Sequence, residues 1–264
     1  MEIKSHDSRE YFSGQQYIAI KNYIDILPLK RLYMNIAIIL SGGVGSRMGK
    51  DIPKQYIKVN NQPIISYSLN TFLSNENIDA IVIGVANEWK DYVKEQIGLI
   101  SSTKPVYLTE PGETRQYSIY NALVLIKGLG YKENDVVIIH DSARPLVSNE
   151  LINQCLLGCC HADGVMPVIP VKDTIYLSSN AKEIDSLLNR NHLWAGQAPE
   201  AFVFGKYLDI HEAISREDLL KINGSTEIAY NAGFKIELIK GDPMNFKITT
   251  PEDLSNFENI INQH

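Results

Sequence analysis

The sequence predicts an α/β protein built on a mostly parallel sheet with helices on both faces. From Met34 onward, short apolar runs rich in branched residues alternate with longer amphipathic segments, which is typical of such sheets. With 44% hydrophobic residues, the 264-residue chain can fill the core of one large domain or two small ones. Strands are predicted at 35–40, 79–85, 105–109, 135–139, 164–169 and 235–240, and helices at about 63–74, 87–98, 115–128, 148–161, 204–216, 225–232 and 251–262.

Residues 1–33 precede this pattern and are predicted to be an N-terminal extension, whose role the sequence does not indicate, ahead of a single domain at 34–264. The extension lacks the basic start and long apolar core of a secretory signal. The chain has no run of 18 apolar residues, which argues against a transmembrane helix, and its net charge of −6 argues against binding to nucleic acid or anionic membranes. Cys155, Cys159 and Cys160 match neither a zinc pattern nor a disulfide framework, so we expect buried, inert thiols and a cytoplasmic protein.

The first predicted strand runs directly into a glycine-rich loop. Small residues here allow a tight turn and let backbone N–H groups face an anion. Arg47 and Lys54 add two separated cations, and Pro53 fixes the backbone just before the lysine. This combination suits a triphosphate whose charge must be held while one bond breaks. The small residues are Ser41, Gly42, Gly43 and Gly45.

Two familiar phosphate loops do not fit this stretch. A Walker loop requires serine or threonine after glycine and lysine, whereas Asp51 follows Gly49-Lys50. The dinucleotide fingerprint requires a third glycine where the chain has Met48. An ordinary strand-to-helix turn with two surface cations is the alternative interpretation of the loop alone.

Three loops, at 41–50, 110–114 and 140–145, follow predicted strands and are expected to meet at one sheet edge, where open α/β sheets bind ligands. Asp141 stands at the carboxyl end of the run DVVIIH (135–140) and is well placed for Mg²⁺; a capping or loop aspartate is the alternative. His140 and Asp141 do not predict a catalytic dyad, because neighbours on a strand point to opposite faces.

The pattern GxGxRMG…PKQY does not stand alone. It is followed by GETRQYSIYNAL (112–123), HDSARP (140–145), PVKDT (170–174), LWAGQAPEAF (193–202) and NFKITTPEDL (245–254). In this order the motifs, which span about Met34 to Ile261, resemble the cytidylyltransferases of the methylerythritol-phosphate and ribitol-phosphate type. The resemblance implies a Rossmann-like nucleotidyltransferase fold and attack of a substrate phosphate on the α-phosphorus of CTP.

The resemblance also implies roles for individual residues. Arg47, Lys54 and Lys247 match the family's catalytic cations, although the TTPED sequence after Lys247 also has the form of a helix start. Asp141 matches the position that holds Mg²⁺, and Arg115 is interpreted as structural. The residues expected to bind CTP are Ser41, Gly42, Gly43, Gly45, Gly112, Glu113, Ser118 and Arg144.

Residues 171–193 interrupt the alternation with a hairpin-like pattern around Ser178-Ser179-Asn180. In the family this arm crosses to a second subunit, which implies a homodimer; an unpartnered surface hairpin is the alternative. Asp173, Thr174 and Arg190 match the arm residues that bind the acceptor. The family's threonine-proline-glutamine is here Ala198-Pro199-Glu200, so Glu200 is expected to alter acceptor preference.

The sequence therefore favours transfer of CMP to a phosphorylated small molecule, such as a ribitol-5-phosphate-like polyol or another phosphorylated metabolite, for a surface polysaccharide such as a capsule. One alternative is the methylerythritol-phosphate enzyme of isoprenoid synthesis. Another, from a different class, is an inactive nucleotide-binding homologue, against which the four residues Arg47, Lys54, Asp141 and Lys247 argue.

Overall fold

The computed structural model describes residues 33–43 and 52–263, in two compact units. The larger unit holds the described residues up to Val168 and those from Gly196 onward, and the smaller unit holds Ile169–Ala195. The predicted N-terminal extension, apart from Tyr33, lies outside the described residues. So do Gly45 and Arg47 of the glycine loop.

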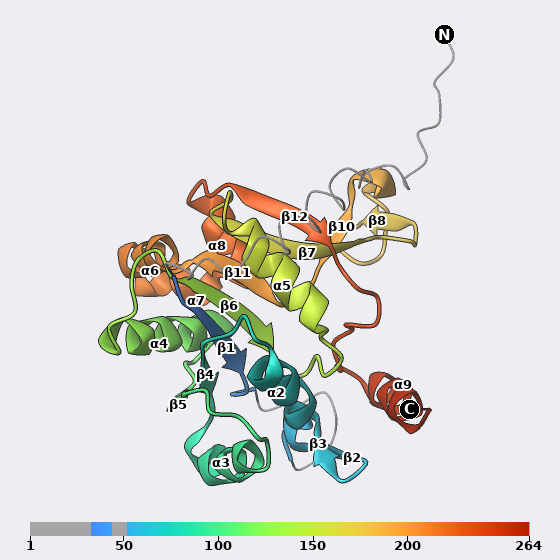
Figure 1. The fold of residues 1–264 in the computed structure, drawn as a ribbon. Coiled ribbons are helices and arrows are strands. Elements are labelled where there is room, and N and C mark those ends of the chain that lie inside the picture. The colour runs from blue at the N-terminus through green and yellow to red at the C-terminus, as the bar shows by residue number, and fades with distance from the viewer. Residues whose placement is uncertain (1–32, 44–51, 264) are drawn as a thin grey trace, which may run out of the picture. The chain divides into compact units, whose positions relative to one another are not determined.

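The larger unit is organised around one twisted sheet (Figure 1). Its strands lie in the order β7-β11-β6-β1-β4-β5, and β12 also pairs with β7. Most neighbours are parallel, whereas β11 is antiparallel to both β6 and β7. The strands are β1 (Asn35–Leu40), β4 (Ala80–Gly84), β5 (Val106–Thr109), β6 (Val136–Asp141), β7 (Gly164–Pro170), β11 (Glu200–Val203) and β12 (Ile236–Lys240).

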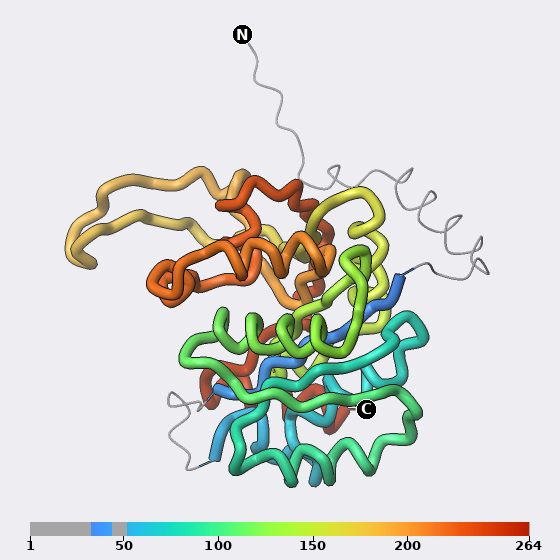
Figure 2. Tube along the Cα trace, turned by 90° about the vertical axis from the view of Figure 1, so that its left-hand side faces the viewer, coloured from blue at the N-terminus to red at the C-terminus, as the bar shows by residue number. Residues whose placement is uncertain are grey.

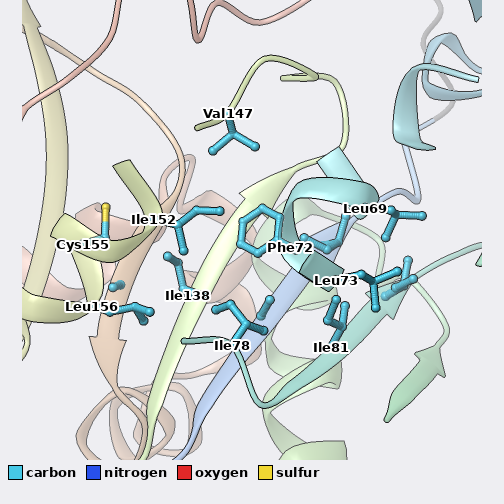
Figure 3. Packing of buried hydrophobic residues seen from close by; sticks show 14 of the residues in the cluster. Leu69, Phe72, Leu73, Ile78, Ile81, Ile138, Val147, Ile152, Cys155 and Leu156 are labelled. Atoms are coloured by element: carbon cyan, nitrogen blue, oxygen red, sulfur yellow. The ribbon is translucent and has the colours of Figure 1, made fainter. Parts of the chain in front are cut away.

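Helices cover both faces of this sheet. Along β1, Ala37 and Ile39 face a core formed with α2 and α5, while Ile36 and Ile38 face the core formed with α4 and α6. Burial on both faces explains why the central strands are continuous apolar runs. Figure 3 shows Phe72 of α2 and Ile152 of α5 in the first of these cores. The helices are α2 (Ile64–Ser74), α3 (Lys90–Gly98), α4 (Arg115–Gly128), α5 (Asn149–Gly158), α6 (Phe204–Ala213), α7 (Arg216–Lys221), α8 (Ser225–Asn231) and α9 (Pro251–Asn262).

The six predicted strands and the fold class are confirmed, and three local expectations need correction. Strand β11 was not predicted, because it has only four residues and begins with a glutamate. The helix predicted at 204–216 ends at Ala213, and Ser215 caps a separate helix, α7, by accepting from the N–H of Asp218. Cys155 and Cys159 are buried as expected, but Cys160 is exposed.

The smaller unit is the predicted hairpin, traced in yellow and orange in Figure 2. Strands β8 (Ile175–Leu177) and β9 (Ser186–Leu188) pair antiparallel, and β10 (Trp194–Gly196) begins at the end of this unit. Near its base, Arg190 Nη1 donates to the carbonyl oxygen of Lys172 at 2.8 Å. Large apolar side chains are exposed along the hairpin, namely Tyr176, Leu177, Ile184 and Leu187.

Candidate active site

The three loops expected to meet at the carboxyl edge of the sheet do so in their described parts. Ser142, after β6, donates from its backbone N–H and its hydroxyl to the carbonyl oxygen of Leu40, at 3.2 and 2.7 Å. Gly42 lies against Pro111, and a Cβ at this glycine would overlap the proline ring. A Cβ at Gly112 would likewise overlap Tyr117. Glycine is therefore required at both positions so that the loops can approach closely.

The start of the glycine loop is held by the residues that follow Lys54. Gln55 Nε2 donates to the carbonyl oxygens of Ser41 and Gly43, at 2.8 and 2.9 Å. The hydroxyl groups of Tyr56 and Ser41 also lie 2.9 Å apart. Gln55 and Tyr56 belong to the PKQY motif, but the sequence analysis assigned roles only to its proline and lysine.

Asp141 lies at the centre of a cationic cluster. Its Oδ1 accepts from Arg115 Nε at 3.2 Å and its Oδ2 from Lys247 Nζ at 2.7 Å, with Arg144 Nε 4.0 Å from Oδ2. Burial alone would raise the pKa of Asp141, but the three cations hold it well below its ordinary value. The carboxylate is therefore ionised throughout the physiological pH range.

The neighbouring His140 is fully buried and packs into the core. Burial lowers its pKa to about 4, so the ring is neutral near pH 7. Its Nε2 lies 3.0 Å from the carbonyl oxygen of Arg144, and its ring packs beside Phe72. The side chain supports the loop after β6 from the core.

Arg115, which the sequence analysis interpreted as structural, is the central residue of this cluster. Its Nε contacts Asp141, its Nη1 donates to the hydroxyl of Ser225, and its Nη2 lies 3.6 Å from Glu200 Oε2. The side chain thus joins the end of β6, the start of β11 and the start of α8. The only sequence signal for this role was its place inside the GETRQYS motif, as the first residue of α4.

The structure places Glu200 in this cluster, with 9% of its surface exposed. Its Oε1 accepts from the hydroxyl of Thr226 at 3.2 Å, and Arg115 is the cation beside its Oε2. Three cations, including Arg144 and Lys247, therefore surround two carboxylates, with one positive charge in excess. The excess suits an anionic ligand at this edge of the sheet.

The segment 245–248 brings Lys247 and Lys54 to the same region. Arg144 Nη1 donates to the carbonyl oxygen of Asn245 at 2.7 Å, and Ile248 N donates to Ala143 O at 2.9 Å. Lys54 Nζ donates to the carbonyl oxygen of Ile248, also at 2.7 Å. As the sequence predicts, Thr250 then caps α9, with Pro251 in its first turn.

The loop expected to bind the base is closed by Ser118. Its hydroxyl donates to the carbonyl oxygen of Thr114 at 2.9 Å and accepts from Gly112 N at 3.0 Å. Glu113 is exposed and forms an ion pair with Arg216. Ser118 thus ties the loop to the first turn of α4 through Gly112 and Thr114.

The remaining predicted residues belong to the smaller unit. Asp173 and Thr174 precede β8, Arg190 follows β9, and all three are exposed. Among the described residues, no group of three or more histidine, cysteine or acidic side chains could hold a metal ion by itself. The described helices also include none that is long and apolar enough to span a membrane.

Comparison with known proteins finds matches that cover most of the chain. Residues 35–263 match the family model of 2-C-methyl-D-erythritol 4-phosphate cytidylyltransferase. An enzyme of that name from Clostridium beijerinckii is 38% identical over 219 residues, which cover 83% of this chain and 94% of the relative. A ribitol-5-phosphate cytidylyltransferase from Vibrio parahaemolyticus is 32% identical, with 86% and 96% covered.

The solved structures agree. The 2-C-methyl-D-erythritol 4-phosphate cytidylyltransferase of Francisella tularensis superposes with a TM-score of 0.70 at 27% identity, over 85% of this chain and 99% of that one. The chain therefore belongs to the 2-C-methyl-D-erythritol 4-phosphate cytidylyltransferase family of CTP-dependent nucleotidyltransferases.

Proposed function

We propose that the protein transfers CMP from CTP to a phosphorylated small-molecule acceptor in the cytoplasm, giving a CDP-activated metabolite and pyrophosphate. The observation that carries this proposal is the buried Asp141 flanked by Arg115, Arg144 and Lys247, beside glycine loops at the carboxyl edge of the sheet. An acceptor phosphate oxygen attacks the α-phosphorus, and the bond from this phosphorus to the bridging oxygen breaks, so that pyrophosphate leaves with the electron pair. The nucleophile is already ionised near neutral pH, and the protein needs only to position and neutralise two polyanions.

The catalytic cations are Lys54, Lys247 and Arg47. Lys54 and Lys247 approach the edge of the sheet from different segments. Lys54 donates to Ile248 O and Lys247 donates to Asp141 Oδ2, and phosphate oxygens can take the place of these acceptors. Donors placed where charge develops stabilise the transition state more than the ground state. Arg47 is assigned by its motif and lies outside the described residues.

The nucleotide is held by the two glycine loops and, we propose, by Mg²⁺ at Asp141. Magnesium usually binds one or two carboxylates together with substrate phosphates, so a single buried carboxylate fits an ion that arrives with CTP. The ion would neutralise charge on the phosphate oxygens. The CTP-binding residues are Ser41, Gly42, Gly43, Gly45, Gly112, Glu113, Ser118 and Arg144.

The nucleotide preference gives a first prediction. CTP with Mg²⁺ should raise the melting temperature more than ATP, GTP or UTP, because a loop shaped for cytosine leaves hydrogen bonds unmade with the other bases. Thermal-shift titration of the four nucleotides, each with and without Mg²⁺, measures this. An equal response to all four would contradict the assignment of residues 112–118 to the base.

The acceptor we favour is a ribitol-5-phosphate-like polyol, or another phosphorylated metabolite, for a surface polysaccharide. Relatives named ribitol-5-phosphate cytidylyltransferase, at 32–33% identity, support this choice. The relative named 2-C-methyl-D-erythritol 4-phosphate cytidylyltransferase, at 38%, supports that substrate as the second candidate. Pyrophosphate release from CTP, measured across phosphorylated polyols, sugars, amino acids and methylerythritol phosphate, decides between them. Release with none of these acceptors would contradict the proposal.

We propose further that Asp173, Thr174 and Arg190 bind the acceptor of a partner subunit, with Glu200 influencing acceptor choice. Exposed apolar side chains on the hairpin, such as Leu177 and Leu187, support burial against a second copy of the chain. The active form is then a homodimer in which the arm of each subunit completes the acceptor site of the other.

Mixing two variants, each of low activity at an acceptor concentration below the raised KM, tests this arrangement. Lys54→Ala and Arg190→Ala subunits should together recover part of the activity, because a mixed dimer contains one intact site assembled from both chains. Arg190→Ala alone should raise the acceptor KM and leave CTP binding unchanged. A fully active monomer, or no recovery on mixing, would mean that the arm is only a surface hairpin.

A further inference from the structure

The position of Glu200 differs from that of an ordinary substrate contact. It begins β11 and lies opposite Ile139 of β6, two residues before Asp141. Only 9% of its surface is exposed. The register of two neighbouring strands, rather than a surface loop, therefore sets the distance between the two carboxylates.

The two carboxylate oxygens of Glu200 differ in their hydrogen bonding. Its Oε1 accepts from Thr226 at 3.2 Å, whereas its buried Oε2 has no hydrogen-bond donor among the described residues. A buried carboxylate oxygen without a donor is costly unless a cation is close. The cation beside it is Arg115, whose Nη2 lies 3.6 Å away, close enough for attraction but too long for a hydrogen bond.

Each of the three nitrogens of the Arg115 guanidinium faces a different partner. Nε faces Asp141, Nη1 faces the hydroxyl of Ser225, and Nη2 faces Glu200. A planar fork with partners on three nitrogens cannot rotate without losing one of them. If the charge of Glu200 were removed, only one anion, Asp141, would orient the fork.

We propose that Glu200 is a positioning residue, which acts through Arg115 to hold Asp141 in the orientation needed for transfer and does not contact the acceptor. With Arg115 fixed on Oδ1, the other oxygen of Asp141 faces Lys247 at 2.7 Å. A small displacement of a reacting group lowers the rate strongly even when binding survives. This inference rests on the proposed transfer reaction, and it changes how Glu200 influences acceptor choice.

The test is a double-mutant cycle with two readouts. Glu200→Gln, Arg115→Met and the double variant are compared by urea unfolding and by turnover of CTP with ribitol 5-phosphate and with methylerythritol phosphate. Glu200→Gln should lower kcat about tenfold, leaving the KM values for CTP and the acceptor within about threefold, the pattern of a lost transition-state interaction. In the Arg115→Met background the same substitution should leave kcat unchanged. In urea unfolding, the effect of the double variant on the equilibrium constant should differ about tenfold from the product of the two single effects.

Two further variants keep the test decisive. Thr226→Val removes the hydrogen bond to Glu200 but keeps the charge, so it should lower kcat in the same direction and by less. Glu212→Gln is the matched control, because Glu212 also pairs with a cation of α4, Lys127, but lies away from Arg115. It should leave kcat unchanged.

The opposite pattern would overturn the proposal. If Glu200→Gln raised the acceptor KM, left kcat unchanged and acted equally with or without Arg115, Glu200 would contact the acceptor directly. If the changes in unfolding free energy of the two single variants simply added in the double variant, Glu200 and Arg115 would not be coupled. If the wild-type protein turned over neither acceptor, the proposed reaction would fail on its own, while the unfolding cycle would still decide whether Glu200 and Arg115 are coupled.

Discussion

Replacing Lys54 by alanine should lower kcat by about a hundredfold or more, with little change in the dissociation constant of CTP. The reason is that negative charge on the α-phosphoryl group grows as the reaction proceeds, so a cation placed there contributes more to the transition state than to binding. Lys54 is half-buried and held at the carbonyl oxygen of Ile248, which keeps its ammonium beside the segment that carries Lys247. Arg47→Ala should behave in the same way.

The measurement separates rate from affinity, with kcat from pyrophosphate release and CTP affinity from calorimetry. Lys58, four residues further on and exposed, is the matched control, and Lys58→Ala should change neither quantity. Near-normal turnover by folded Lys54→Ala protein would move the catalytic centre elsewhere.

Replacing Arg115 by methionine should destabilise the fold by roughly 3 kcal/mol at neutral pH, because it leaves two buried carboxylates without their shared cation. Both Asp141 and Glu200 are 9% exposed, so water cannot take the place of the guanidinium easily. Exposed arginines offer a contrast. The ion pair of Arg216 with Glu113 lies in solvent, and Arg216→Met should leave the free energy of unfolding nearly unchanged.

The pH dependence of this effect has a definite sign. In the wild-type protein the pKa of Asp141 is held below its ordinary value, so its ionised form stabilises the fold above about pH 4, and that contribution is lost as the pH falls further. Without Arg115 the folded-state pKa rises, and protonation relieves the unpaired charge. The stability difference between wild type and Arg115→Met should therefore be largest at neutral pH and should narrow as the pH is lowered through and below the ordinary carboxylate range, about pH 4. Urea unfolding across this range measures it, and a constant difference would show that the lost contact is not electrostatic.

The parts predicted correctly from the sequence are those governed by local patterns. The buried strand β1 is an uninterrupted apolar run, and the start of α9 carries its capping threonine and proline in order. The expected meeting of three loops also followed from strand order alone. Such features depend on residues close together in the chain.

The arrangement around Arg115 could not be predicted in this way. Asp141, Glu200 and Ser225 lie 26 to 110 residues from Arg115. The insertion of β11 between β6 and β7 brings Glu200 beside the strand that ends in Asp141. Strand β11 has too few residues to show a period. From the sequence, Glu200 could be interpreted only as a change in the acceptor pocket. The structure adds that its carboxylate is paired with Arg115.

The contacts of segment 245–248 also have a consequence for the stage of synthesis at which the site can be complete. Lys247 reaches Asp141 across 106 residues of sequence, and Ile248 accepts from Lys54 across 194. At about 5–20 residues per second, a ribosome completes β1 and its loop many seconds before this segment is made. A nascent chain stalled ahead of Asn245 should thus lack Lys247, a cation of the proposed reaction centre, so the proposed activity is expected only once synthesis is nearly complete.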